Sequence, residues 1–211
     1  MMALRRKVMA AAKQGSILPA AYQQVEWVQA TNGAYIDTNY TPTVNTRAEL
    51  EYELTSNGNS HHFLFGIEPN SPCIKVEFRY GSRWYIRCCE KNVNNPSELL
   101  DVGLTANTRY VMSLTPTAFS INTATVTPSN NLINNNFDHV YLYAGNNAGS
   151  PYEAIDTMKV YDFKFFENDT LSLHFVPCYR KSDNEIGFYD TVAGAFYGNS
   201  GTGTLLKGAD V

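Results

Sequence analysis

The chain has 211 residues, enough for one large all-β domain or two small ones, and with 44% hydrophobic and only 17% charged residues its composition excludes a disordered protein. The first 25 residues contain four basic and no acidic residues, so the rest of the chain carries all 20 acidic residues. An acidic body argues against nucleic-acid binding, and no segment is apolar enough over sufficient length to predict membrane insertion.

Residues 1–17 predict an N-terminal helical anchor segment. Residues 2–14 have helical composition with a small apolar stripe, and a Gly-Ser pair ends the helix. A helix this short is marginal alone, so we expect it to dock on the body, a sister subunit or another protein. Its apolar run is too short for a secretory signal peptide. The expected anchor residues are Leu4, Arg5, Arg6, Lys7 and Val8.

From Val25 onward, short runs of period two alternate with Asn- and Gly-rich turns, and no internal repeat is present. Many short strands with frequent turns predict a β-sandwich or barrel. The expected strands are 25–30, 34–40, 47–55, 61–67, 73–80, 84–90, 107–115, 118–127, 138–145, 155–166, 170–176, 186–190 and 195–198.

Side-chain alternation predicts the register of two hairpins. In "CIKVEFRYGSRWYIRCCE", a three-residue loop pairs Phe78 with Ile86 and sets the apolar residues, including Trp84, on one face toward the core. In "YDFKFFENDTLSLHF", the same test favours a loop over residues 167–169. That loop aligns Tyr161, Phe163 and Phe165 with Phe175, Leu173 and Leu171, and predicts that these aromatics belong to the core.

The four cysteines give no metal-binding pattern. None forms a C-x-x-C pair, so we expect reduced, mostly buried thiols and no zinc, with a disulfide as the alternative. The histidines do not converge in sequence, and no ligand set for calcium or another cofactor stands out.

Two stretches carry a resemblance to known proteins. The segments "LPAAYQQVEWVQATNGAYIDTNY" and "HFVPCYRKSDNEIGFYDTVAGAFYGNSGTGTLLKGADV" resemble phage, prophage and gut-bacterial proteins with concanavalin A-like, laminin-G-like domains. The resemblance covers 18–211 and implies a two-sheet antiparallel jelly-roll sandwich. Relatives often turn the last hairpin through Asn-Gly; here Ala193-Gly194 stands there, so we expect a wider loop.

The run "ELEYE" is the sharpest enzymatic signal. Glu49, Glu51 and Glu53 alternate and so share one face of a strand, similar to the acidic run of jelly-roll glycoside hydrolases of the laminarinase type. Here the middle residue is Glu51 rather than Asp, and no Trp flanks the run. We therefore expect an acidic outer face without a substrate cleft, and no catalytic residue.

Glycan binding needs exposed aromatic rings with amide or charged groups beside them. Candidates lie on the outer face of the 73–90 hairpin and in the loop 146–152, although ordinary turns and a solvated face explain them equally well. The candidate residues are Arg79, Tyr85, Arg87, Asn146, Asn147 and Tyr152.

The resemblance implies a non-enzymatic, lectin-like virion surface protein: a decoration, head-fibre or tail-associated adhesin. Its expected partners are other virion proteins through the anchor segment, sister subunits and cell-surface glycans, with no cofactor. A bacterial cell-surface carbohydrate-binding module is the alternative, and a jelly-roll glycoside hydrolase the third hypothesis.

Overall fold

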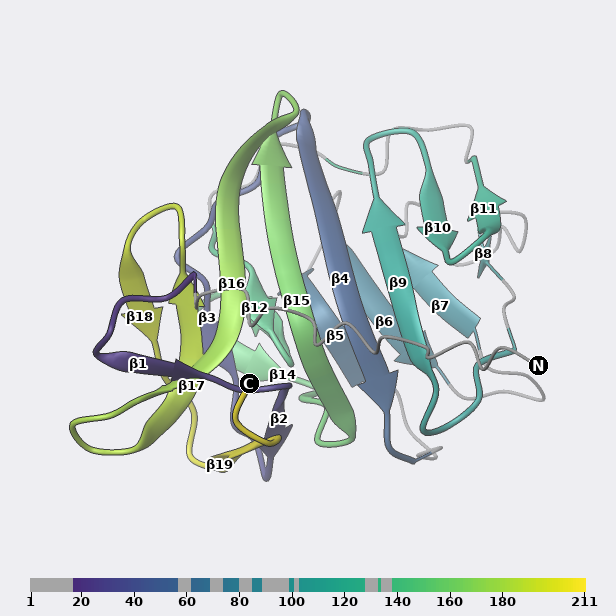
Figure 1. Ribbon diagram of the computed structural model, residues 1–211. Coiled ribbons are helices and arrows are strands. Elements are labelled where there is room, and N and C mark those ends of the chain that lie inside the picture. The colour runs from purple at the N-terminus through teal and green to yellow at the C-terminus, as the bar shows by residue number, and fades with distance from the viewer. Residues whose placement is uncertain are drawn as a thin grey trace, which may run out of the picture.

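The computed structural model describes residues 17–56, 62–68, 74–79, 85–88, 99–100, 103–127, 133 and 138–211. These residues form a β-sandwich of two sheets, with the large sheet in front of the small sheet in Figure 1. The expected helix over residues 2–14 and its anchor residues lie outside the described ranges.

The large sheet has eleven strands among the described residues and follows the order β11-β10-β9-β4-β15-β16-β17-β18. All its pairings are antiparallel; β1 pairs with β16, and β2 pairs with both β15 and β19. The strands are β1 (Tyr22–Gln24), β2 (Val28–Thr31), β4 (Thr46–Leu54), β9 (Arg109–Leu114), β10 (Phe119–Ile121), β11 (Ala124–Val126), β15 (Met158–Glu167), β16 (Thr170–Arg180), β17 (Glu185–Asp190), β18 (Ala195–Tyr197) and β19 (Thr204–Lys207).

The small sheet has eight strands in the described residues and follows the order β14-β13-β5-β6-β7-β8; β12 also pairs with β5, and β3 pairs with β12. One pairing, β5 with β13, is parallel. The strands are β3 (Ile36–Asp37), β5 (His62–Glu68), β6 (Lys75–Arg79), β7 (Tyr85–Cys88), β8 (Leu99–Leu100), β12 (Tyr141–Leu142), β13 (Gly145–Asn147) and β14 (Ser150–Tyr152).

Aromatic side chains between the sheets hold the core together. The ring of Phe65 on β5 lies 5.2 Å from that of Phe163 on β15, measured between centroids. Phe163 in turn contacts Phe175, and Phe175 stacks on Phe188 at 5.6 Å. All four side chains are fully buried, so one continuous row of rings joins the two sheets.

The register predicted for the first hairpin is confirmed where it is described. Phe78 pairs with Ile86 and Glu77 with Arg87, as the predicted register requires. The expected burial of Trp84 lies outside the described residues.

The register predicted for the second hairpin is wrong. Glu167 pairs with Thr170, so the turn has only two residues, Asn168 and Asp169, both with positive φ (49° and 60°). Asn and Asp tolerate this conformation, which suits a tight hairpin turn. A β-bulge after Leu171 then restores the alternation, so Phe163 pairs with Phe175.

Several other boundaries differ from the expected strands. Residues 118–127 form a hairpin rather than one strand, because Asn122 takes a positive φ of 51°. The strand expected over 138–145 is broken at Tyr143, whose φ is 73°. The terminal hairpin turns through four residues, 191–194, in agreement with the wider loop expected there.

The two stretches that carry the family resemblance pack against each other. β1 pairs with β16, β2 pairs with β19, and Val25 forms an isolated bridge with Asp210. The chain thus joins its first described strands to its last ones, and residues far apart in sequence form one closed end of the large sheet.

Cys178 on β16 is buried and has a free thiol. It belongs to a small cluster with Leu18 and Val176, separate from the main core. Burial raises the pKa of the thiol to about 12, so the side chain serves packing rather than nucleophilic chemistry. The other three cysteine side chains lie outside the described residues.

The pairing of β2 with β19 is testable at Gly203. A Cβ there would lie inside van der Waals contact of the backbone oxygens of Thr31 and Asn32. We expect Gly203→Ala to destabilise the fold by about 1–3 kcal/mol, measured by urea unfolding. Gly103→Ala is the matched control, because nothing lies within 4 Å of its added Cβ. Equal stability of the two variants would contradict tight closure.

Candidate functional site

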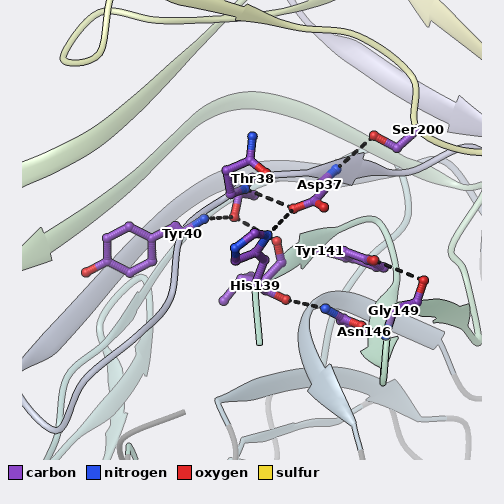
Figure 2. A network of polar contacts seen from close by, with 10 residues as sticks. Asp37, Thr38, Tyr40, His139, Tyr141, Asn146, Gly149 and Ser200 are labelled. Atoms are coloured by element: carbon purple, nitrogen blue, oxygen red, sulfur yellow. Dashed lines mark hydrogen bonds and ion pairs between the residues drawn. The ribbon is translucent and has the colours of Figure 1, made fainter. Parts of the chain in front are cut away.

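The predicted loop 146–152 is held by a network of polar contacts (Figure 2). Asn146 donates from its Nδ2 to the carbonyl of His139 (2.7 Å) and accepts at its Oδ1 from the N–H of Gly149 (2.7 Å). The hydroxyl of Tyr141 donates to the carbonyl of Gly149 (3.2 Å). On the other side, His139 Nδ1 lies 3.3 Å from Asp37 Oδ1.

The side-chain amide of Asn146, a glycan-binding candidate from the sequence, bonds within the protein. It is only 3% exposed, and both ends of its amide are already used within the protein. Asn147 is half-buried in β13 and pairs through its backbone with Ser150. Tyr152 is 41% exposed on the edge strand β14, with its ring edge-on to Phe63.

The remaining predicted residues do not join Tyr152. Arg79 pairs with Tyr85, and Arg87 pairs with Glu77, on β6 and β7; the side chains of Arg79, Tyr85 and Arg87 lie outside the description. Three strands, β13, β5 and β6, separate β14 from β7 in the small sheet. At about 4.8 Å between neighbouring strands, Tyr152 on β14 lies roughly 14 Å from β6 and roughly 19 Å from β7. The structure does not assemble the predicted candidates into one compact site.

The acidic run on β4 lies on the outer face of the large sheet, the face turned away from the small sheet, as its alternation predicts. Leu50, Tyr52 and Leu54 are buried on the opposite face. The carboxylates are not freely solvated, since each one contacts a cation. The contacts are Glu49 with Arg47, Glu51 with Arg109 and Glu53 with Lys159.

A cavity of about 460 Å³ opens on this outer face, beside the closed end of the large sheet. It combines two aromatic rings with charged and amide groups. The lining residues are Gln24, Val25, Glu26, Trp27, Arg109, Tyr161 and Val211. Its volume falls in the range of pockets that bind small ligands.

The strand pairing of β15 creates this cavity. Lys159 and Val160 pair with β2 on one side of β15, whereas Phe163 and the residues after it pair with β16. Between them, Tyr161 is the extra residue of a bulge opposite β4. Both Tyr161 and Asp162 are consequently half-buried on the outer face, and the cavity forms where the neighbouring strand changes.

A chain of contacts fixes the polar side of the cavity. The guanidinium of Arg109 lies over the ring of Tyr161 at 3.8 Å from its centroid, and its Nε is 2.7 Å from Glu51 Oε1. The hydroxyl of Tyr161 donates to Glu53 Oε2 (3.0 Å). Lys159 Nζ donates to Glu53 Oε1 (2.7 Å). The rings and charges are thereby held in one arrangement before any ligand arrives.

These contacts keep Glu53 ionised. Burial alone would raise the pKa of Glu53, but hydrogen bonds from Lys159 and Tyr161 outweigh it, so the pKa lies below its usual value. Burial, together with the hydrogen bond to Glu53, raises the pKa of Tyr161 to about 12. A general acid for glycoside hydrolysis needs a carboxyl with a raised pKa, the opposite of what Glu53 has.

A second polar chain crosses the outer face at β16. His174 Nε2 lies 2.7 Å from Asp162 Oδ1, and its Nδ1 lies 3.1 Å from Thr191 Oγ1. This order of carboxylate, imidazole and hydroxyl resembles a nucleophilic triad. However, the backbone N–H of Thr191 already donates to the carbonyl of His174, and that of Val192 donates to Asp190 Oδ1. They offer no oxyanion hole, so the chain fastens the 191–194 turn to the sheet.

Sequence reasoning missed the cavity for definite reasons. Strict alternation predicts that Tyr161 lies in the core with Phe163, whereas the bulge places it on the outer face. Trp27 lies between β1 and β2, where alternation breaks. The spacing of Val25 and Val28 was the sequence signal for the exposure of Trp27. Both valines are buried, and Glu26 and Trp27 between them lie outside the core.

No protein-family model matches the chain, and no curated protein is similar to it at a significant level.

In the part of the chain that the structure describes, no helix could cross a membrane and no cluster of three or more His, Cys, Asp or Glu side chains could hold a metal ion.

The Asp162 contacts predict a specific pH dependence of stability. Burial would raise the pKa of Asp162, but hydrogen bonds from His174 and Lys164 lower it below the usual 3.8. Its contribution is therefore complete above pH 4 and is lost as the pH falls through the lowered pKa. We expect Asp162→Asn to be less stable than wild type near pH 6, with the gap closing toward pH 2. Urea unfolding across this range measures it, and a constant gap would contradict the assignment.

Proposed function

We propose that this protein is a non-enzymatic, lectin-like module that binds glycans in the cavity on the outer face of the large sheet. The observation that carries the proposal is the combination of Trp27, Tyr161 and Arg109 in one cavity. Sugars bind proteins through aromatic rings for their apolar faces and through polar groups for their hydroxyls. The loop 146–152 is a weaker candidate, because the side-chain amide of Asn146 already makes hydrogen bonds within the protein.

The surroundings of the carboxylates support binding over hydrolysis. Each glutamate of the acidic run is paired with a cation, and Glu53 is held ionised. Retaining and inverting glycosidases both need one carboxylic acid that keeps its proton near neutral pH.

The wider role follows the resemblance given by residues 18–40 and 174–211. We propose a jelly-roll sandwich displayed on a virion surface as a decoration, head-fibre or tail-associated adhesin. Residues 1–17 would attach it to other virion proteins or to sister subunits. Display on a bacterial cell surface is the alternative, and the same binding site would serve it.

A glycan array tests the binding proposal. We expect wild type to bind at least one glycan class, and Trp27→Ala to lose at least tenfold in affinity because it removes one ring of the cavity. Tyr152→Ala is the matched aromatic control, since Tyr152 is exposed on the small sheet. A reducing-sugar assay on the bound glycans should show no cleavage.

Two outcomes would contradict this proposal. Loss of binding in Tyr152→Ala with full binding in Trp27→Ala would move the site to the loop 146–152. Release of reducing ends that Glu51→Gln or Glu53→Gln abolishes would replace a binding module with a hydrolase.

Deletion of residues 1–15 tests the attachment role. We expect the truncated protein to keep its melting temperature and to be absent from purified particles, as measured by immunoblot. A truncated protein that fails to fold would make the segment part of the core. One that folds and still enters particles would place the attachment elsewhere on the sandwich.

A further inference from the structure

The guanidinium of Arg109 is held in place by two contacts. Its Nε lies 2.7 Å from Glu51 Oε1, and its Cζ lies 3.8 Å from the centroid of the Tyr161 ring. Its side chain is nevertheless 52% exposed. Among the described residues, neither terminal amine of Arg109 donates a hydrogen bond to the protein. The two amines therefore form an oriented pair of donors at the cavity wall.

The rest of the wall adds both donors and acceptors. The side-chain amide of Gln24 and the indole N–H of Trp27 have no hydrogen-bond partner in the described part of the chain. Glu26 accepts one long contact, 3.4 Å from the N–H of Ala209, and keeps further acceptor capacity. Hydroxyl groups both donate and accept, so a wall of this mixed character suits several hydroxyls on one ligand.

The charge around the cavity does not favour an anion. Arg109 and Lys159 supply two positive charges, while Glu26, Glu51 and Glu53 supply three negative ones. Both cations are already paired with carboxylates. A carboxylate, sulfate or phosphate on the ligand would meet a wall without net positive charge, whereas neutral hydroxyls would meet no such penalty.

We infer that the cavity takes a neutral, polyhydroxylated sugar residue, with the two terminal amines of Arg109 donating to two adjacent hydroxyl oxygens. This inference rests on the proposed glycan binding and narrows it to unsubstituted hexose-type units rather than uronates or sulfated sugars. Trp27 and Tyr161 supply the aromatic rings of the site, with Arg109 over one face of the Tyr161 ring and Lys159 Nζ 5.0 Å from the centroid of the Trp27 ring.

The chain has only two tryptophans, so fluorine NMR can locate binding directly. Protein labelled with 5-fluorotryptophan should give two signals, and Trp27→Phe identifies the signal of Trp27 by its loss. The probes are neutral oligosaccharides of glucose, galactose and mannose, alongside oligogalacturonate and sulfated galactan fragments. We expect neutral probes to shift the Trp27 signal, and anionic probes of equal length to bind at least tenfold more weakly.

Arg109 variants test the donor pair. Arg109→Lys keeps the charge but loses the planar pair, and we expect it to weaken neutral-probe binding at least tenfold, as should Arg109→Gln. Arg47→Gln is the matched control, because Arg47 also lies over an aromatic ring, Phe166 at 3.7 Å, but outside the cavity. It should bind as wild type does.

The outcomes separate the inference from the proposed function. Preferred binding of anionic probes, or unchanged binding in both Arg109 variants, would overturn the inference and leave glycan binding standing. No response of either tryptophan signal and no signal on the array would overturn both. Neutral-probe binding that depends on Arg109 and not on Arg47 would support both.

Discussion

The rest of the structure depends on the pairing of the first described strands with the last. β2 lies between β15 and β19, and Val25 bridges Asp210, so the large sheet is closed by residues about 180 positions apart in sequence. Such non-local pairing must offset the entropy of closing a long loop before its contacts contribute. The cavity lies at this junction: five of its seven lining residues come from the two ends of the chain, and only Arg109 and Tyr161 come from the middle.

Irregular pairing, rather than regular strand, produces the chemistry of the outer face. The bulge at Tyr161 places two consecutive side chains on the same face, one lining the cavity and the other, Asp162, binding His174. A regular strand would have turned one of them into the core. The bulge therefore sets both the composition of the site and the fastening of the neighbouring turn.

The fold class could be predicted from the sequence, and the site could not. Alternation correctly predicted the core faces of β4 and the pairing of Phe78 with Ile86, because a period of two survives wherever strands are regular. It failed at Tyr161 and at Glu167, where a bulge and a two-residue turn change the register. Asn146 looked like a free loop amide because sequence does not show that His139 and Gly149 occupy both of its ends.

The position of Val211 has a practical consequence for work on this protein. Its N–H donates to the carbonyl of Gln24, and the residue lines the cavity. A substitution at Val211 would change the wall of the cavity but keep this backbone hydrogen bond, so the position can be varied to alter what the cavity accepts.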